Sequence, residues 1–147
     1  MKTPFLGVVA LFSLFSLSCK DSGSSFDFRN IGDPYARWKA YGLSNYEMSQ
    51  SLNCFCAYHG PYRVTVTNNR VTKVIDTSNG NAIPPNGQQA FKTVDELFAI
   101  VQSINPATVA QFSVEYDSQY GFPSFYVDPD RNVADEEYGY STRNLTF

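Results

Sequence analysis

The sequence predicts an α+β domain, in which a mainly antiparallel sheet of about five to six strands carries two helices packed on one face. Two segments have apolar residues at helical spacing, and six shorter segments alternate between apolar and polar residues, as strands with one buried face do. Their order along the chain is helix, three strands, helix, three strands. This order favours a sheet of antiparallel neighbours covered by helices on one side.

The first helix is expected to begin at Pro34, with Asp33 as its N-cap and the proline in the first helical position. Aromatic residues recur along it at helical spacing, and Gly42 ends it. The only tryptophan, Trp38, lies on this aromatic face. We therefore expect Trp38 to anchor the helix in the core.

Three strands are expected to follow this helix. From Tyr46 to the triplet Cys54-Phe55-Cys56 the apolar residues share one parity, which predicts a half-buried strand that ends at the triplet. Alternation returns over 62–67 and again over 70–76. The asparagine pair between these two segments suits a tight turn, so they are expected to form a hairpin.

The second half of the chain repeats this order. Residues 77–92 are rich in Ser, Asn, Gly, Pro and Gln and predict an exposed connection. The segment 93–96 reads as a capping box, and it opens a helix whose apolar face continues to Ile104 before Asn105-Pro106 ends it. Three further strands are expected over 110–117, 124–128 and 138–147.

The amino terminus has the parts of an export signal. A short start carrying Lys2 precedes an apolar run that gives way at Ser18 to Cys19 and a polar, small-residue stretch. We expect a signal peptide over 1–18, a lipid on the Cys19 thiol with a flexible tether over 19–32, and a single domain over 33–147. Cleavage of the same bond by ordinary signal peptidase, which would leave a free thiol, and a retained membrane anchor are the alternatives.

Composition limits the partners of the protein. The 147 residues carry a net charge of −3 and no basic stripe, which argues against nucleic acid as a partner. The expected location is the bacterial cell envelope, anchored by lipid in the outer membrane and facing the periplasm, with a soluble periplasmic or secreted protein as the alternative. The expected partners are the membrane, through the lipid, and an envelope protein or glycan, which the many tyrosines and phenylalanines could contact.

The triplet Cys54-Phe55-Cys56 supports two kinds of chemistry. An oxidising envelope favours a disulfide between Cys54 and Cys56. Residues i and i+2 of a regular strand lie roughly 6 to 7 Å apart, so this bond would require the chain to bend. Alternatively, both thiolates and His59, the only histidine, would hold Cu or Zn. A fourth ligand is missing, so we favour the local disulfide over metal binding and over thiol exchange with a partner.

A second cluster is acidic and consists of Asp128, Asp130, Asn132 and Asp135. Alternating carboxylate and amide oxygens in a tight loop are what Ca²⁺ coordinates. The spacing is not that of an EF-hand, because the sixth position lacks glycine and the twelfth lacks glutamate. The favoured interpretation is a solvated turn that protects an edge strand, and the calcium loop is the alternative.

Catalytic signatures are missing from the sequence, which contains no Gly-x-Ser-x-Gly elbow, no phosphate loop and no second histidine for a metallohydrolase. The segment 116–123 contains aromatic residues with turn-forming glycine and proline, and we expect them to pack rather than to bind a ligand. The expected function is therefore a non-catalytic binding or structural domain with no cofactor. The alternative is a thiol-active or metal-handling envelope protein that uses Cys54 and Cys56.

Several motifs occur in a fixed order along the chain, namely Trp38, the Cys-x-Cys triplet, Tyr-Arg-Val-Thr-Val at 62–66, and Tyr-Asp-x-x-Tyr-Gly-Phe-Pro at 116–123. In these motifs the chain resembles a family of exported bacterial proteins, many of them lipoproteins, that is classified as a domain of unknown function. The resemblance covers about residues 34–147. It implies a compact α+β domain in the cell envelope, and it supplies no activity.

Overall fold

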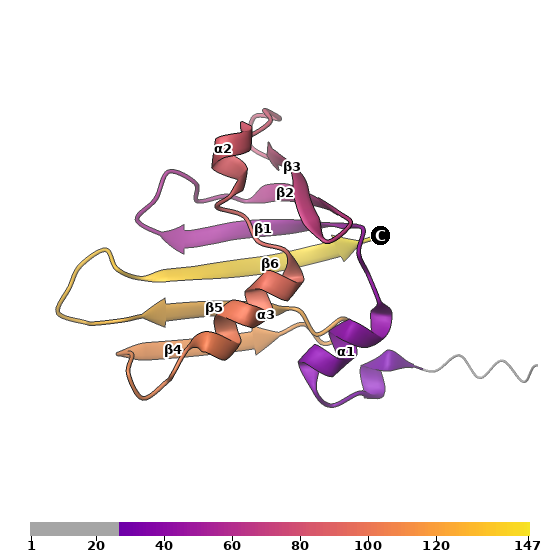
Figure 1. Ribbon diagram of the computed structural model, residues 1–147. Coiled ribbons are helices and arrows are strands. Elements are labelled where there is room, and N and C mark those ends of the chain that lie inside the picture. Colours follow the sequence, from indigo (N-terminus) through magenta and orange to yellow (C-terminus); the bar gives the residue numbers. More distant parts are fainter. Residues whose placement is uncertain (1–26) are drawn as a thin grey trace, which may run out of the picture.

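The computed structural model describes residues 27–147. The predicted signal peptide and Cys19 therefore lie outside the described residues. Within this range six strands form one antiparallel sheet in the order β3-β2-β1-β6-β5-β4 (Figure 1). The strands are β1 (Tyr46–Cys54), β2 (Tyr62–Thr67), β3 (Arg70–Asp76), β4 (Gln111–Tyr116), β5 (Pro123–Asp128) and β6 (Tyr138–Thr146).

The sheet consists of two three-stranded meanders that meet at its centre. β1, β2 and β3 follow one another in the first, and β4, β5 and β6 do so in the second. The first and last strands of the chain then pair with each other, so that Leu52 lies opposite Tyr140 and Gln50 opposite Thr142. The predicted sheet is confirmed in class and strand number.

The two longer helices lie on one face of this sheet, as the sequence predicts (Figure 1). They are α1 (Pro34–Tyr41) and α3 (Val94–Ser103), and two short helical segments, η1 (Phe28–Asn30) and α2 (Pro85–Gln88), accompany them. The Asp33 carboxylate caps α1, and Gly42 ends it in the left-handed conformation with φ 61°. The capping box at the start of α3 is present in both directions between Thr93 and Glu96.

The core between helices and sheet is largely aromatic. Trp38 on α1 is 2% exposed and packs edge-on against Tyr46 of β1, and Tyr35 meets Phe98 of α3 with ring centroids 5.0 Å apart. A smaller cluster joins α3 to β5 through Leu97, Val101, Phe125 and Val127. The predicted role of Trp38 as a core anchor is confirmed.

The segment 77–92 differs from the predicted exposed connection. It contains α2, and the backbone N–H of Ile83 donates to the carbonyl of Val74 along the outer edge of β3. Phe91 is 2% exposed and packs on Tyr62. The polar composition hides this one aromatic anchor, which fastens the segment to the core.

No helix within residues 27–147 combines the length and apolar character that crossing a bilayer requires.

Candidate functional site

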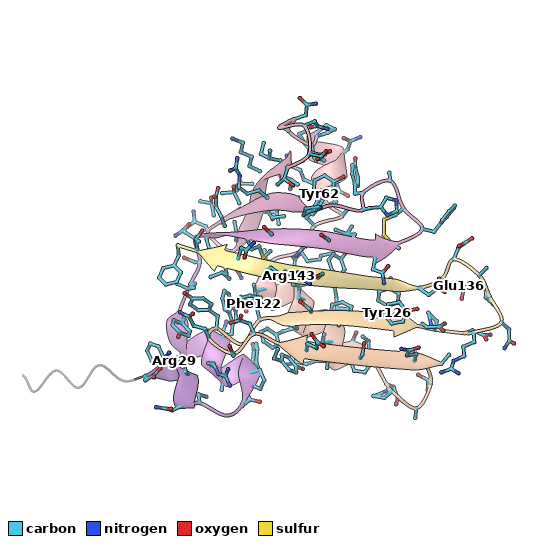
Figure 2. All side chains as sticks on the ribbon, turned by 180° about the vertical axis from the view of Figure 1, so that it is seen from behind. Arg29, Tyr62, Phe122, Tyr126, Glu136 and Arg143 are labelled. Carbon is cyan, nitrogen blue, oxygen red and sulfur yellow. A yellow bond between two sulfur atoms is a disulfide. The ribbon has the colours of Figure 1, made fainter. Side chains whose placement is uncertain are left out.

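The side of the sheet away from α1 and α3, called here the open face, carries no helix and is viewed directly in Figure 2. Side chains alternate between the two faces of a strand, so the residues between the buried positions of each strand point to this side. Most of them are small and polar. They include Ser49, Ser51 and Asn53 from β1, Arg63 and Thr65 from β2, Ser141 and Arg143 from β6, Tyr126 from β5, and Ser113 and Glu115 from β4.

Strand register places two arginines in one row across the open face. Arg63 of β2 lies opposite Ser49 of β1, and Ser49 lies opposite Arg143 of β6. Neighbouring strands are about 4.8 Å apart, so the two arginines lie about 10 Å apart on either side of the serine. In the next row Ser51 and Ser141 lie directly opposite each other.

Two hollows meet at Arg143. One has a volume of about 410 Å³ and lies over β1 and β6, and the other has a volume of about 370 Å³ and lies towards β4 and β5. Both are lined by Ser141, Arg143 and Asn144. The first also includes Ser49 and Ser51.

The second hollow has a cause in the pairing of β5 with β6. Their ladder ends at the pair Phe125 and Tyr140. Beyond this pair the Ser124 hydroxyl donates to the carbonyl of Thr142 (3.2 Å) and accepts from its backbone N–H (2.9 Å). The Ser124 side chain thus replaces the backbone hydrogen bonds of the ladder, and β5 and β6 separate next to Arg143.

An irregularity in β6 sets the direction of the Arg143 side chain. The register between β1 and β6 shifts between Glu47 and Ser49, and Asn144 has a positive φ of 54°. Such bulges turn a strand locally and redirect a side chain. Arg143 is the residue immediately before this turn.

Neither arginine of the row is neutralised by a neighbour. The ion pairs among residues 27–147 are Arg29 with Asp27 and Lys39 with Asp95, and no hydrogen bond joins the guanidinium of Arg63 or Arg143 to any described residue. The nearest carboxylate along β1, Glu47, accepts a hydrogen bond of 2.8 Å from the Thr65 hydroxyl and pairs with neither arginine. Both guanidinium groups therefore keep their hydrogen-bond donors available to a ligand.

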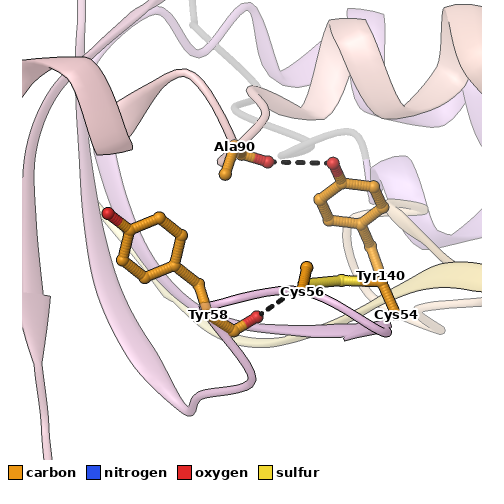
Figure 3. Close-up of a disulfide and its surroundings, with 5 residues drawn as sticks. All are labelled: Cys54, Cys56, Tyr58, Ala90 and Tyr140. Carbon is orange, nitrogen blue, oxygen red and sulfur yellow. Dashed lines mark hydrogen bonds between the residues drawn. A yellow bond between two sulfur atoms is a disulfide. The ribbon is translucent and has the colours of Figure 1, made fainter.

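Cys54 and Cys56 form the predicted disulfide (Figure 3). β1 ends at Cys54, and the two Cα atoms are 5.3 Å apart, which is shorter than the spacing in a regular strand and fits the expected bend. Phe55 between them is 82% exposed. The Cys56 sulfur lies 3.2 Å from the carbonyl oxygen of Tyr58.

The structure does not gather Cys54, Cys56 and His59 into a metal site. Both sulfurs are used in the disulfide, and His59 is exposed, its carbonyl accepting from the backbone N–H of Leu52. Among residues 27–147 no group of three or more His, Cys, Asp or Glu side chains is placed to hold a metal ion.

The acidic cluster of Asp128, Asp130, Asn132 and Asp135 is not gathered into a metal site either. Asp130 accepts from the backbone N–H of Asn132 at 2.9 Å and from its side chain at 2.8 Å, and these hydrogen bonds lower the pKa of Asp130. Asp128 belongs to β5, where it pairs with Gln111 and is 9% exposed, while Asp135 sits in the loop with φ 69°. The oxygens serve a turn and a strand end. The predicted protection of an edge strand is wrong, because this loop joins β5 to β6, which are both inner strands of the sheet.

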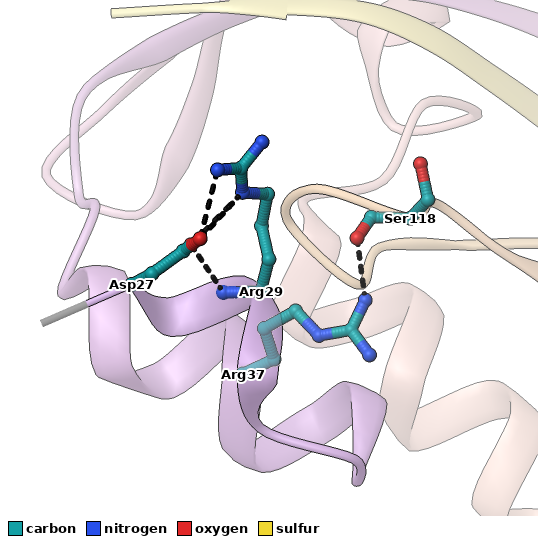
Figure 4. A network of polar contacts seen from close by, with 4 residues as sticks. All are labelled: Asp27, Arg29, Arg37 and Ser118. Carbon is teal, nitrogen blue, oxygen red and sulfur yellow. Dashed lines mark hydrogen bonds and ion pairs between the residues drawn. The ribbon is translucent and has the colours of Figure 1, made fainter.

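The segment 116–123 joins α1 to the sheet. The Asp117 carboxylate accepts from the backbone N–H groups of Gln119 and Tyr120, and Arg37 of α1 donates to the carbonyl of Ser118 at 2.8 Å (Figure 4). Figure 4 also shows Arg29 paired with Asp27, whose pKa this arginine lowers. Tyr120 packs edge-on against the tyrosine at the end of α1, so the predicted packing role is confirmed.

The model of a family of unknown function, DUF6174, matches residues 32–147. The chain belongs to this family. No curated protein and no solved structure matches it. The DUF6174 domain thus spans the whole sheet and both longer helices, and the fold and surface described above are those of the family domain in this chain.

The row of Arg63, Ser49 and Arg143 in this DUF6174 domain is not identified by the sequence reasoning. The parity of Ser49 and Ser51 does place them on the polar side of β1. What the sequence lacks is the pairing of β1 with β6, whose residues are some ninety positions apart. An arginine in mid-strand with no acidic residue beside it is the one local signal, and it is weak.

Proposed function

We propose that this DUF6174 protein is a lipid-anchored, non-catalytic binding domain of the bacterial cell envelope, and that its open face binds another envelope component. One observation carries the proposal: one side of a six-stranded sheet is bare and holds two hollows that meet at an unpaired arginine. Concave sites with a few convergent polar groups are where ligands bind. The opposite side is occupied by the core.

The chemistry of the first hollow suits binding. Its side chains are serine, threonine and asparagine with Pro61 and Arg143, and none of them is a base that would activate a serine for nucleophilic attack. Two carboxylates line the second hollow: Asp117 accepts from two backbone amides, and Glu115 has no side-chain partner among the described residues. No histidine or lysine lines this hollow to form an acid-base pair with Glu115.

The envelope location rests on the amino-terminal sequence. Cys19 follows an apolar run and precedes a polar stretch, the arrangement of an acylated mature terminus. In cells of the host bacterium, the wild-type protein should incorporate labelled palmitate and sediment with membranes. Cys19→Ser should lose both properties. A variant that stays in the membrane fraction with its label would contradict lipid attachment at this residue.

The binding role is tested by photo-crosslinking of the full-length protein in the same cells. A benzophenone amino acid is placed at Ser51 or Ser113 on the open face, or at Gln102, an exposed residue of α3 on the other side. We expect adducts of one defined mass from both open-face positions and none from Gln102. No adduct from the open face, or equal adducts from all three positions, would reject the proposed function.

A further inference from the structure

Arg143 determines the charge that a ligand of the open face must carry. Its side chain is exposed, lines both hollows, and has no hydrogen-bond or ion-pair partner among residues 27–147. Arg63, one strand beyond Ser49, is equally exposed and unpaired. A guanidinium pairs with a carboxylate through two parallel hydrogen bonds. Two such groups in one row therefore favour an anionic ligand with more than one acidic group.

The floor between and beside the arginines is made of hydroxyl groups. Ser49, Ser51 and Ser141 are half-buried, and their hydroxyls have no hydrogen-bond partner among the described residues. Each hydroxyl can donate one hydrogen bond and accept others. Small side chains also let a ligand approach the sheet closely. A ligand that offers many hydroxyl groups of its own satisfies this floor best.

Apolar anchors for a protein partner are lacking in the first hollow. No aromatic side chain lines it, whereas Tyr116 and Phe122 line the second hollow. Phe55, the most exposed large hydrophobic residue of the described range, sits in the disulfide loop beyond the end of β1. Protein interfaces depend on buried aromatic and apolar anchors at their centre. The first hollow therefore favours a polar saccharide over a protein or peptide.

We propose that the first hollow, together with the row of Arg63, Ser49 and Arg143, binds an acidic oligosaccharide, whose carboxylate groups pair with Arg143 and Arg63 and whose hydroxyl groups bond to Ser49, Ser51 and Ser141. This inference rests on the proposed function and adds the class of ligand. The lining of the first hollow contains no carboxylate, whereas Glu115 and Asp117 line the second hollow on the other side of Arg143. Glu47 lies two residues from Ser49 along β1 and makes no ion pair with either arginine.

Isothermal titration of the full-length protein in detergent tests the proposal with three probes: trigalacturonate, neutral maltotriose and triglutamate. We expect trigalacturonate to bind at least tenfold more tightly than either of the others, with an affinity that falls as salt rises. Arg143→Gln and Arg63→Gln should each weaken it about tenfold or more, the size of one charge-assisted hydrogen-bonded pair. Arg70→Gln, which removes an equally exposed and unpaired arginine that lines another hollow, beside Phe91 and Thr93, should leave it unchanged.

Three results would overturn the acidic saccharide. The first is equal or tighter binding of triglutamate, which would favour an acidic peptide. The second is equal binding of maltotriose, which would remove the need for charge. The third is binding of trigalacturonate that is absent altogether or indifferent to Arg143→Gln. If one of these results is obtained while Ser51 and Ser113 still give crosslinked adducts in cells, the open face binds a ligand of another class. If those two positions give no adducts either, the proposed binding role is rejected as well.

Discussion

Gln50 is the residue whose replacement tests most directly how the helical layer is fastened to the sheet. It lies at the centre of β1 and is 0% exposed. Its side-chain oxygen accepts from the backbone N–H of Lys92 at 3.0 Å, and its side-chain nitrogen donates to the carbonyl of the same residue at 3.1 Å. The segment just before α3 is thus bound to β1 by one amide at both of its polar ends.

Gln50→Leu keeps the size of the side chain and removes both bonds. The N–H and carbonyl of Lys92 then lose their partners in a partly buried place, at about 1–3 kcal/mol each. The more apolar side chain offsets roughly 1–2 kcal/mol of this loss. We expect the free energy of unfolding to fall by about 2–4 kcal/mol, which lowers the melting temperature by about 6–12 °C for a chain of this size.

Gln50→Glu separates hydrogen bonding from packing. One carboxylate oxygen can accept from the Lys92 N–H, but the other faces the Lys92 carbonyl and can bond to it only when protonated. The folded state therefore raises the pKa of the introduced acid, and the stability that protonation gives is present at low pH and lost as pH rises through that pKa.

Chemical denaturation of the wild type and both variants at pH 4 and pH 7 provides the measurement. The difference between Gln50→Glu and Gln50→Leu should grow in favour of Glu at pH 4. A Leu variant whose free energy of unfolding lies within about 0.5 kcal/mol of the wild-type value, or a Glu variant whose pH dependence equals that of Leu, would refute the reasoning.

Three further predictions concern residues of the core and the disulfide loop. Asp95→Ala removes the acceptor of the buried Trp38 indole N–H (3.0 Å) and should cost about 1–3 kcal/mol in urea unfolding, whereas Asp95→Asn, which keeps an oxygen there, should cost less. Burial raises the pKa of Tyr46 above its ordinary value of about 10, so the stability that depends on its neutral form is complete below pH 10 and declines above it. The difference in denaturant midpoint between the wild type and Tyr46→Phe should therefore narrow from pH 9 to pH 11. Replacing Cys54 and Cys56 by alanine opens only a very small loop and should lower stability by less than about 2 kcal/mol, and a larger loss in the same assay would contradict this.

Much of the fold follows from local sequence, and its exceptions have identifiable causes. Alternation and capping signals predict every strand and both longer helices within a residue or two of their ends. The prediction over 77–92 is wrong because it depends on the average composition of the segment, which is polar. The burial of one side chain, Phe91, holds the segment against the core in spite of its polar neighbours. Gln50 is polar but occupies a position of β1 at which the strand alternation predicts burial, and this combination indicates a buried hydrogen bond. The partner, Lys92, is forty-two positions away and is identified only by the structure. The candidate site depends on the pairing of β1 with β6, and no local pattern encodes which strands become neighbours.

The serines of the open face give a second, independent argument for the proposed binding role. β1 and β6 are the central strands of the sheet, where β-branched and aromatic residues would stabilise pairing best. Their buried side carries the aromatic residues Tyr46 and Tyr140 and the large aliphatic Leu52. On the open side the cross-strand pair is instead Ser51 with Ser141, two residues that add little to pairing and leave a hollow. The polar side chain that departs from this preference on the buried side, Gln50, is bonded to Lys92, whereas the hydroxyls of Ser51 and Ser141 have no partner among the described residues. Unpartnered polar groups beside Arg143 are what the proposed binding role requires.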